Sequence, residues 1–158
     1  MLKNKIISLV ELSRIRNELK KRKLVFTNGC FDLLHFGHVK YLEEAKAKGD
    51  VLVVAVNSDS SIRKIKGKGR PITQEKDRLG VIAGLESVDY VVKFNQSTPL
   101  KVIQKLKPDI LVKGADWNQE SIVGADFVRS YRGRVCRIKL LNGRSTTNLI
   151  KKIGKIRD

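Results

Sequence analysis

The sequence predicts a doubly wound α/β domain built on a five-stranded, mainly parallel sheet. Five short apolar runs alternate along the chain with segments of helical periodicity, a pattern typical of a parallel sheet with helical connections. The run at residues 51–56 is apolar at every position, as expected of a strand buried on both faces. Polar clusters directly follow four of the predicted strands, and such folds bind ligands at the carboxyl ends of their strands.

The expected elements follow in chain order. A helix at about residues 8–21 begins at Ser8, which forms a capping-box pattern with Glu11. Strands are expected at residues 24–27, 51–56, 90–94, 110–113 and 135–141. The other helices are expected at 38–48, just after 57–59, at about 73–85 with Thr73 as its cap, at 99–106, at 119–131 and after 144–148.

The length and composition indicate one globular domain. A chain of 158 residues, 41% of them apolar, can bury a hydrophobic core. The sequence shows no internal repeat and no low-complexity segment. We expect residues 1–23 to form a helical extension packed on the domain formed by residues 24–158.

The charge balance predicts an anionic ligand or partner. Lysine and arginine total 33 against 16 aspartate and glutamate residues, which gives a net charge of +17. Nucleotides, sugar phosphates, nucleic acids and anionic membranes all fit such a charge, as does a basic surface with no particular partner. The sequence has neither an apolar run long enough for a membrane span nor a signal peptide, so we expect a cytoplasmic location. Two cysteines, Cys30 and Cys136, are expected to be reduced.

Both histidines of the chain lie between the first predicted strand and the helix that follows it. His35 and His38 are three residues apart, so they project from nearly the same side of the first helical turn. The free N–H groups and the dipole at a helix N-terminus attract anions, and Gly37 allows a ligand to approach closely. The stretch therefore predicts a phosphate site.

Other interpretations of this stretch have weaker support. A zinc site could use the two histidines with Asp32, but no further histidine or cysteine stands at a suitable spacing. Cys30 could act as a thiol nucleophile, although nothing resembles a nucleophile elbow and packing explains a small apolar residue at a strand end. The chain contains neither a Walker A loop nor a G-x-G-x-x-G fingerprint after the first strand, which disfavours kinases and dehydrogenases.

Three further segments at the same sheet edge each have two interpretations. The basic, glycine-rich segment at residues 64–71 is either a mobile loop that closes over an anionic substrate or a solvated loop. Trp117 either stacks on a base or covers the edge of the sheet. The hydroxyls at residues 145–147 either bind terminal phosphates or only cap the last helix.

The segment Gly29-Cys30-Phe31-Asp32-Leu33-Leu34-His35-Phe36-Gly37-His38 resembles the G-x-F-D-x-x-H-x-G-H signature of the cytidylyltransferase-like nucleotidyltransferases. Ser145-Thr146-Thr147 is similar to the distal serine/threonine motif of that superfamily. The resemblance covers about residues 24–153 and implies a single Rossmann-like domain. Segments 56–59, 66–71, 112–116 and 145–148 look most like those of the D-glycero-β-D-manno-heptose 1-phosphate adenylyltransferases, the ADP-heptose synthases.

This resemblance implies a reaction and roles for particular residues. ATP and D-glycero-β-D-manno-heptose 1-phosphate would give ADP-heptose, a precursor of lipopolysaccharide core or related glycans, and pyrophosphate. His35 and His38 would be catalytic. The implied nucleotide-binding residues are Asn28, Gly29, Cys30, Phe31, Asp32, Lys113, Gly114, Asp116, Trp117, Ser145, Thr146 and Thr147. The expected substrate-binding residues are Asn57, Asp59, Lys66 and Arg70. Mg²⁺ would arrive with ATP, and the resemblance favours a homodimer.

Two alternative functions remain open at the level of sequence. Cytidylyltransferases acting on glycerol 3-phosphate or a similar polyol phosphate typically carry an arginine several residues before the serine/threonine motif. This chain has Leu140 and Leu141 there, with Arg144 directly before Ser145. Its segment 114–117 nevertheless resembles those enzymes too. A basic nucleic-acid-binding module is the other alternative, and the lack of interleaved aromatic and basic residues argues against it. We therefore expect neither a nucleic-acid nor a membrane partner.

Overall fold

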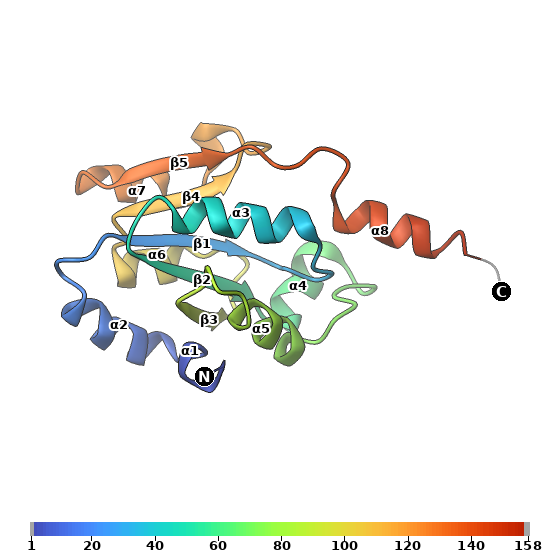
Figure 1. The fold of residues 1–158 in the computed structure, drawn as a ribbon, viewed down its shortest axis with the longest axis horizontal. Helices are drawn as coiled ribbons and strands as arrows, with labels where there is room; N and C mark the ends of the chain where they lie inside the picture. The colour runs from blue at the N-terminus through green and yellow to red at the C-terminus, as the bar shows by residue number, and fades with distance from the viewer. Residues whose placement is uncertain (1, 157–158) are drawn as a thin grey trace.

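A five-stranded parallel sheet in the order β3-β2-β1-β4-β5 forms the centre of the computed structural model, which describes residues 2–156 (Figure 1). Every pair of neighbouring strands is parallel, which confirms the predicted fold class. The strands are β1 (Leu24–Gly29), β2 (Val51–Asn57), β3 (Tyr90–Phe94), β4 (Ile110–Gly114) and β5 (Arg134–Ile138). The chain builds outward from β1 to β3 and then returns to place β4 on the other side of β1. This reversal creates a topological switch point between β1 and β4.

Helices cover both faces of the sheet. On one face α3 (Phe36–Lys46) and α5 (Glu75–Ala83) share a buried cluster with the strands. On the other face lie α2 (Leu9–Glu18), α6 (Leu100–Leu106) and α7 (Ala125–Ser130). The remaining helices are α1 (Leu2–Lys5), α4 (Asp59–Lys66), the 3₁₀ turn η1 (Gln119–Ser121) and α8 (Thr146–Ile153). No helix within residues 2–156 combines the length and the apolar character that crossing a bilayer requires.

Strand β2 shows why this sequence forms a sheet covered on two sides. All seven of its residues are buried, and alternate side chains enter opposite clusters. Leu52, Val54 and Val56 join the α3 and α5 cluster, whereas Val51, Val53 and Ala55 join the other. Each buried valine or leucine stabilises the fold by about 1.5–3 kcal/mol, so both helical layers are held to the sheet by the same strand.

The N-terminal segment lies against the sheet. Ser8 is the N-cap of α2, and its Oγ accepts a hydrogen bond from the Glu11 N–H at 3.1 Å, which confirms the predicted cap. The helix ends at Glu18, a few residues before the predicted position. Leu12 is fully buried, and the backbone N–H of Ile7 donates to Val91 in β3.

Three element predictions were wrong in detail. Thr73 does not cap a helix: α5 follows Gln74, because the Thr73 N–H and carbonyl bond instead to Asp32 and Arg78. The helix predicted at 119–131 is split into η1 and α7 by Gly124, which has a left-handed φ of +85°. β5 ends at Ile138 rather than at residue 141, because its partner β4 ends opposite it at Gly114.

Candidate active site

A cavity of about 350 Å³ lies at the carboxyl edge of the sheet, at the switch point between β1 and β4. Its walls come from the loop after β1, the start of α3, the end of α4, the segment after β4 and the segment that leads into α8. Of the predicted site residues, those that line the cavity are Asn28, Gly29, Cys30, Phe31, Asp32, His35, His38, Lys66, Lys113, Gly114, Asp116, Trp117, Ser145, Thr146 and Thr147. The fold therefore brings together segments from Asn28 to Thr147, about 120 residues apart in the sequence.

The two histidines lie at the N-terminus of α3, as predicted, with His35 as the N-cap residue. Their rings stack with centroids 3.9 Å apart and planes 28° from parallel. The backbone N–H of His35 donates to Nδ1 of His38 at 3.3 Å. Because Nδ1 accepts this bond, the hydrogen-bond network assigns the proton of neutral His38 to Nε2.

Both imidazoles are neutral near pH 7. Burial is the main cause that lowers the pKa of His38 to about 4. The charge that His35 carries once it is protonated and the charge of Lys66 lower it further. Burial, followed by the nearby Arg144 guanidinium, lowers the pKa of His35. A neutral His38 with its proton on Nε2 is a hydrogen-bond donor for an anion.

Gly37 and two buried polar atoms indicate that the cavity is shaped for a polar ligand. A Cβ at Gly37 would lie 2.9 Å from Nδ1 of His35 and 3.2 Å from Cβ of Arg144, so this position has no room for a side chain. Nδ1 of His35 and Oδ1 of Asn28 are buried without a hydrogen-bond partner in the described part of the chain. Buried polar atoms are rarely left unpaired unless a ligand or water completes them.

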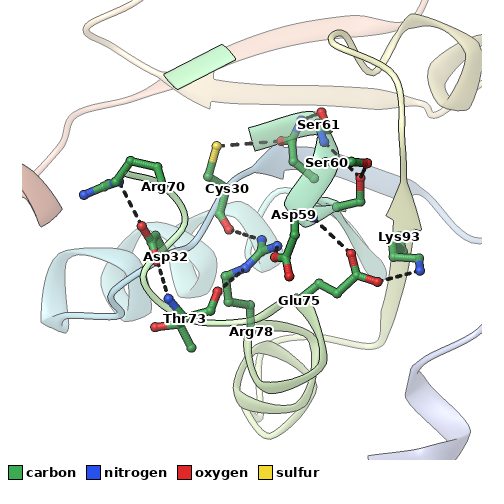
Figure 2. Close-up of polar contacts among 12 residues, drawn as sticks. Cys30, Asp32, Asp59, Ser60, Ser61, Arg70, Thr73, Glu75, Arg78 and Lys93 are labelled. Carbon is green, nitrogen blue, oxygen red and sulfur yellow. Dashed lines mark hydrogen bonds and ion pairs between the residues drawn. The ribbon is translucent and has the colours of Figure 1, made fainter. Parts of the chain in front are cut away.

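Asp32 lines the cavity, but its carboxylate binds the protein. Oδ1 accepts hydrogen bonds from the backbone N–H groups of Ile72 and Thr73, both at 2.8 Å. Oδ2 forms an ion pair with Nε of Arg70 at 3.0 Å. Asp32 therefore ties the loop between α4 and α5 to the loop that follows β1 (Figure 2).

Lys113 and Trp117 form the wall of the cavity next to β4. Nζ of Lys113 donates to the carbonyl of Asn28 at 3.2 Å and lies 5.3 Å from the centre of the Trp117 ring. Burial lowers the pKa of Lys113 to about 8. A Cβ at Gly114 would collide with Oδ1 of Asp116 and lie 3.2 Å from Leu140. Trp117 is 46% exposed, which leaves it open to stacking by a base.

The serine and threonine segment caps α8 and also faces the cavity. Oγ of Ser145 accepts a hydrogen bond from the Asn148 N–H at 3.1 Å, as an N-cap does. Oγ1 of Thr146 donates to the Leu33 carbonyl at 3.2 Å. This bond holds the start of α8 beside the histidine loop. Ser145 is a helix cap as well as part of the cavity lining, and the binding of terminal phosphates by the segment stays a prediction.

Three predicted substrate-binding residues do not line the cavity. Nδ2 of Asn57 donates to Oγ of Ser61, and Oδ1 of Asp59 accepts from Arg78. Arg70 is paired with Asp32 as described above. Their binding of a sugar phosphate stays a prediction.

The structure adds Tyr41, Leu140, Leu141 and Arg144 to the cavity lining. Tyr41 follows His38 by three residues on α3, and this helical spacing is a signal that could have identified it. Its hydroxyl is 2.7 Å from Oγ1 of Thr27 in β1. Arg144 precedes the serine and threonine motif directly, whereas the leucines carry no chemical signal of a site.

Together, this fold and this cavity define a class of protein, the nucleotidyltransferases with paired histidines at the switch point of a doubly wound sheet. The chain belongs to the cytidylyltransferase-like family, whose model matches residues 26–151.

Curated relatives and solved structures agree with this assignment. The chain is 51% identical over 148 residues to the bifunctional protein HldE of Geobacter metallireducens and 53% identical over 150 residues to that of Syntrophotalea carbinolica. These alignments cover 94% and 93% of this chain but only 29% and 31% of those proteins, so the chain spans about a third of their length.

Among solved structures, the lipopolysaccharide core biosynthesis protein of Thermoplasma volcanium is similar with a TM-score of 0.66 and 32% identity. That match covers 77% of this chain and 99% of the other. A pantoate-β-alanine ligase of Francisella tularensis has a TM-score of 0.65 at 19% identity, over 96% of this chain and 78% of its own, and shares the fold alone.

Proposed function

We propose that this protein is an adenylyltransferase that joins ATP and D-glycero-β-D-manno-heptose 1-phosphate to give ADP-heptose and pyrophosphate, a precursor step for lipopolysaccharide core or related glycans. The stacked pair His35 and His38, neutral and facing a cavity at a helix N-terminus, is the observation that carries the reaction type. The heptose substrate is supported by the resemblance of the motif segments to ADP-heptose synthases and by the relatives named bifunctional protein HldE.

In the proposed reaction, an oxygen of the sugar phosphate attacks the α-phosphorus of ATP in line, and pyrophosphate leaves without a covalent enzyme intermediate. The protein then contributes positioning and charge stabilisation. Nε2–H of His38 and the free N–H groups of α3 would donate to oxygens of the reacting phosphates. Lys66 and Arg144, which line the same cavity, would offset the charge that develops on the leaving pyrophosphate.

The opposite wall would hold the nucleoside. The exposed Trp117 offers a surface on which a base can stack. Because Gly114 has no side chain, a ligand can approach the backbone of β4 beside it. Asp116 lies next to both and would accept a hydrogen bond from a ribose hydroxyl. Ser145, Thr146 and Thr147 would bind the outer phosphates at the start of α8.

Mg²⁺ would enter with the nucleotide. Residues 2–156 contain no group of three or more histidine, cysteine or acidic side chains that could hold a metal ion. Mg²⁺ commonly reaches such sites on substrate phosphates, and there it would neutralise phosphate charge alongside Lys66 and Arg144. The proposal also includes a cytoplasmic location, which fractionation of cells would test. It includes a homodimer as well, which light scattering of the purified protein would test.

A pyrophosphate-release assay tests the proposed function. Each of ATP, CTP, GTP and UTP is combined with heptose 1-phosphate and, separately, with glycerol 3-phosphate. We expect release with ATP and heptose 1-phosphate, and mass spectrometry should identify ADP-heptose as the product. Release only from CTP and a polyol phosphate would instead assign the protein to the cytidylyltransferases of that substrate class. Salt-sensitive binding to DNA or RNA without any pyrophosphate release would contradict both.

A further inference from the structure

Arg78 of α5 is buried close to the active site, although it does not line the cavity. Its side chain is completely inaccessible to solvent, which is uncommon for arginine. Nη1 donates to the carbonyl of Cys30 at 2.6 Å, Nε to the carbonyl of Thr73 at 2.9 Å, and Nη2 to Oδ1 of Asp59 at 2.8 Å. One guanidinium therefore joins the loop after β1, the loop before α5 and the first residue of α4 (Figure 2).

The carbonyl that Arg78 binds belongs to the peptide preceding Phe31, whose backbone is left-handed with φ of +47°. This conformation costs a residue with a side chain about 1–2 kcal/mol, and it persists only where the surroundings impose it. The next residue, Asp32, is fixed by the N–H groups of Ile72 and Thr73. Phe31 is thus held from both sides, by Arg78 through Cys30 and by the α4–α5 loop through Asp32.

Phe31 in turn forms part of the surroundings of His38. The two rings meet edge to face with centroids 5.6 Å apart and planes 65° apart. The Phe31 ring also lies against Gly29 of β1, where an added Cβ would be only 3.0 Å from Cε2 of Phe31. A change in the backbone at Phe31 would therefore move or expose the imidazole of His38.

We propose that Arg78 is a positioning residue, which fixes the left-handed backbone of Phe31 and thereby the place and burial of the His38 ring. The role in turnover rests on the nucleotidyl transfer proposed above. Arg78 acts through Phe31, since its own guanidinium is occupied by protein groups and does not face the cavity.

The contacts that fix Asp59, the carboxylate partner of Arg78, extend to β3. The backbone N–H of Asp59 donates to Oε2 of Glu75 at 3.0 Å, and Oε1 of Glu75 pairs with Nζ of Lys93 in β3 at 2.7 Å. This chain of contacts fixes Asp59, so Arg78 holds Cys30 relative to a rigid support. It also gives Asp59 a role that does not require contact with substrate.

Replacing Arg78 with lysine keeps the charge but removes the fork that reaches three partners. The chain offers a matched control in Arg16 of α2. Arg16 also bonds one carboxylate, that of Asp109, and backbone carbonyls, those of Leu19, Leu106 and Lys107, but next to the amino end of β4. Arg78→Lys and Arg16→Lys thus remove the same kind of clamp near and far from the cavity.

Activity and histidine NMR are then measured at a temperature at which both variants are folded. We expect Arg78→Lys to lower kcat roughly ten- to hundredfold, the scale for a misplaced catalytic group, with a smaller change in KM for ATP. Arg16→Lys should keep the wild-type kcat. Because the chain has two histidines, both imidazoles can be followed by NMR. The His38 signals should move in Arg78→Lys, and its pKa should rise by about one unit as burial decreases.

Unchanged His38 signals in a folded Arg78→Lys would overturn the proposal, whether or not kcat falls. If Arg78→Lys does not fold, Asp59→Asn is measured instead. This variant keeps Arg78 but weakens its ion pair with residue 59, and the Asp59 side chain is 22% exposed, so the substitution is better tolerated. It should shift His38 in the same direction by a smaller amount, and no shift would again overturn the proposal. The NMR result needs no turnover, so failure of this inference is distinguishable from absence of transferase activity.

Discussion

His38 is built to act as a neutral hydrogen-bond donor. Nδ1 accepts the His35 N–H, so the ring offers Nε2–H to the cavity. Burial and the neighbouring charges hold its pKa at about 4, so the ring does not become cationic before a ligand binds. An incoming polyphosphate would add negative charge beside it and raise that pKa. The first turn of α3 is therefore ready to donate a hydrogen bond without a prior change of protonation.

Removing either imidazole should slow adenylyl transfer. We expect His35→Ala and His38→Ala each to lower kcat about 10²-fold or more, the usual cost of losing one preorganised donor to developing charge. Circular dichroism should show an intact fold. Exposed Lys40→Ala on the same helix serves as a control and should keep full activity. Near-wild-type kcat in both histidine variants would contradict the roles assigned to them.

The low pKa of His38 also predicts how stability depends on pH. The unfolded chain takes up a proton near pH 6.5, whereas folded His38 resists it until about pH 4. The unfolded state therefore binds more protons in this window, and the free energy of unfolding should decrease as pH falls from 6.5 to 4. Urea unfolding of His38→Gln should show a smaller decrease over the same window. Equal slopes for the two proteins would contradict the assigned pKa.

The hydrogen-bond partners of individual side chains were the hardest feature to predict from the sequence. In the sequence, Arg78 looks like an ordinary polar residue of a helix. No neighbouring residue indicates that its side chain bonds to Cys30 and Asp59. The left-handed backbone at Phe31 is equally hidden, because such a conformation is imposed by tertiary contacts on a residue that does not favour it. By contrast, His35 and His38 were recognisable, since a short helical spacing places them on one side of a turn.

Helix α8 depends on its first turn for its position. None of its residues is buried, and Figure 1 shows it extending away from the sheet. Thr146 is bonded to the loop after β1 through the Leu33 carbonyl. This arrangement makes the N-terminal end of α8, where we propose that the outer phosphates bind, the part that is fixed to the domain.

Thr146→Val should therefore loosen α8. A neutral hydrogen bond contributes about 1 kcal/mol, so amide hydrogen exchange within α8 should accelerate roughly fivefold at a matched temperature. KM for ATP should rise because the outer phosphates lose a fixed hydroxyl. Thr146→Ser keeps the donor and should restore both values. Unchanged exchange in Thr146→Val would show that other contacts hold the helix.

Helices and strands were predicted well where the hydrophobic pattern of a short segment defines them. The sheet follows from apolar runs such as β2, and the parallel order follows from the alternation of strands and helices. The helix expected at 119–131 was wrong because the periodicity passes through Gly124, whose left-handed conformation the pattern does not show. Thr73 was misassigned because its backbone groups serve Asp32 and Arg78, partners supplied by the tertiary structure.

The whole molecule combines a strong positive charge with one polar cavity at the switch point. Its net charge of +17 favours the approach of anions, and Lys66 and Arg144 bring part of that charge to the cavity. Most of the lining was predictable because the carboxyl ends of parallel strands gather polar segments at one edge. The sequence did not show that Asn57, Asp59 and Arg70 would be used by the protein itself.

Nucleotide binding should stabilise the whole fold. At a hundred times Kd, a ligand that binds only the folded state adds about 2.7 kcal/mol, which corresponds to a rise in Tm of roughly 5–10 °C for a domain of this size. Thermal scanning with a non-hydrolysable ATP analogue and Mg²⁺ should show this rise, and higher salt should reduce it. Adenosine, which has no phosphates, should give a much smaller shift. A shift with adenosine as large as that with the analogue would contradict a site centred on phosphates.

The most direct test of the account is an NMR titration of the two imidazoles with a non-hydrolysable ATP analogue and Mg²⁺. If the histidine pair binds the triphosphate, the signals of both His35 and His38 should shift in proportion to occupancy, and the pKa of His38 should rise above about 4. Saturable binding of the analogue that leaves both imidazoles unchanged would place the nucleotide elsewhere and contradict the account.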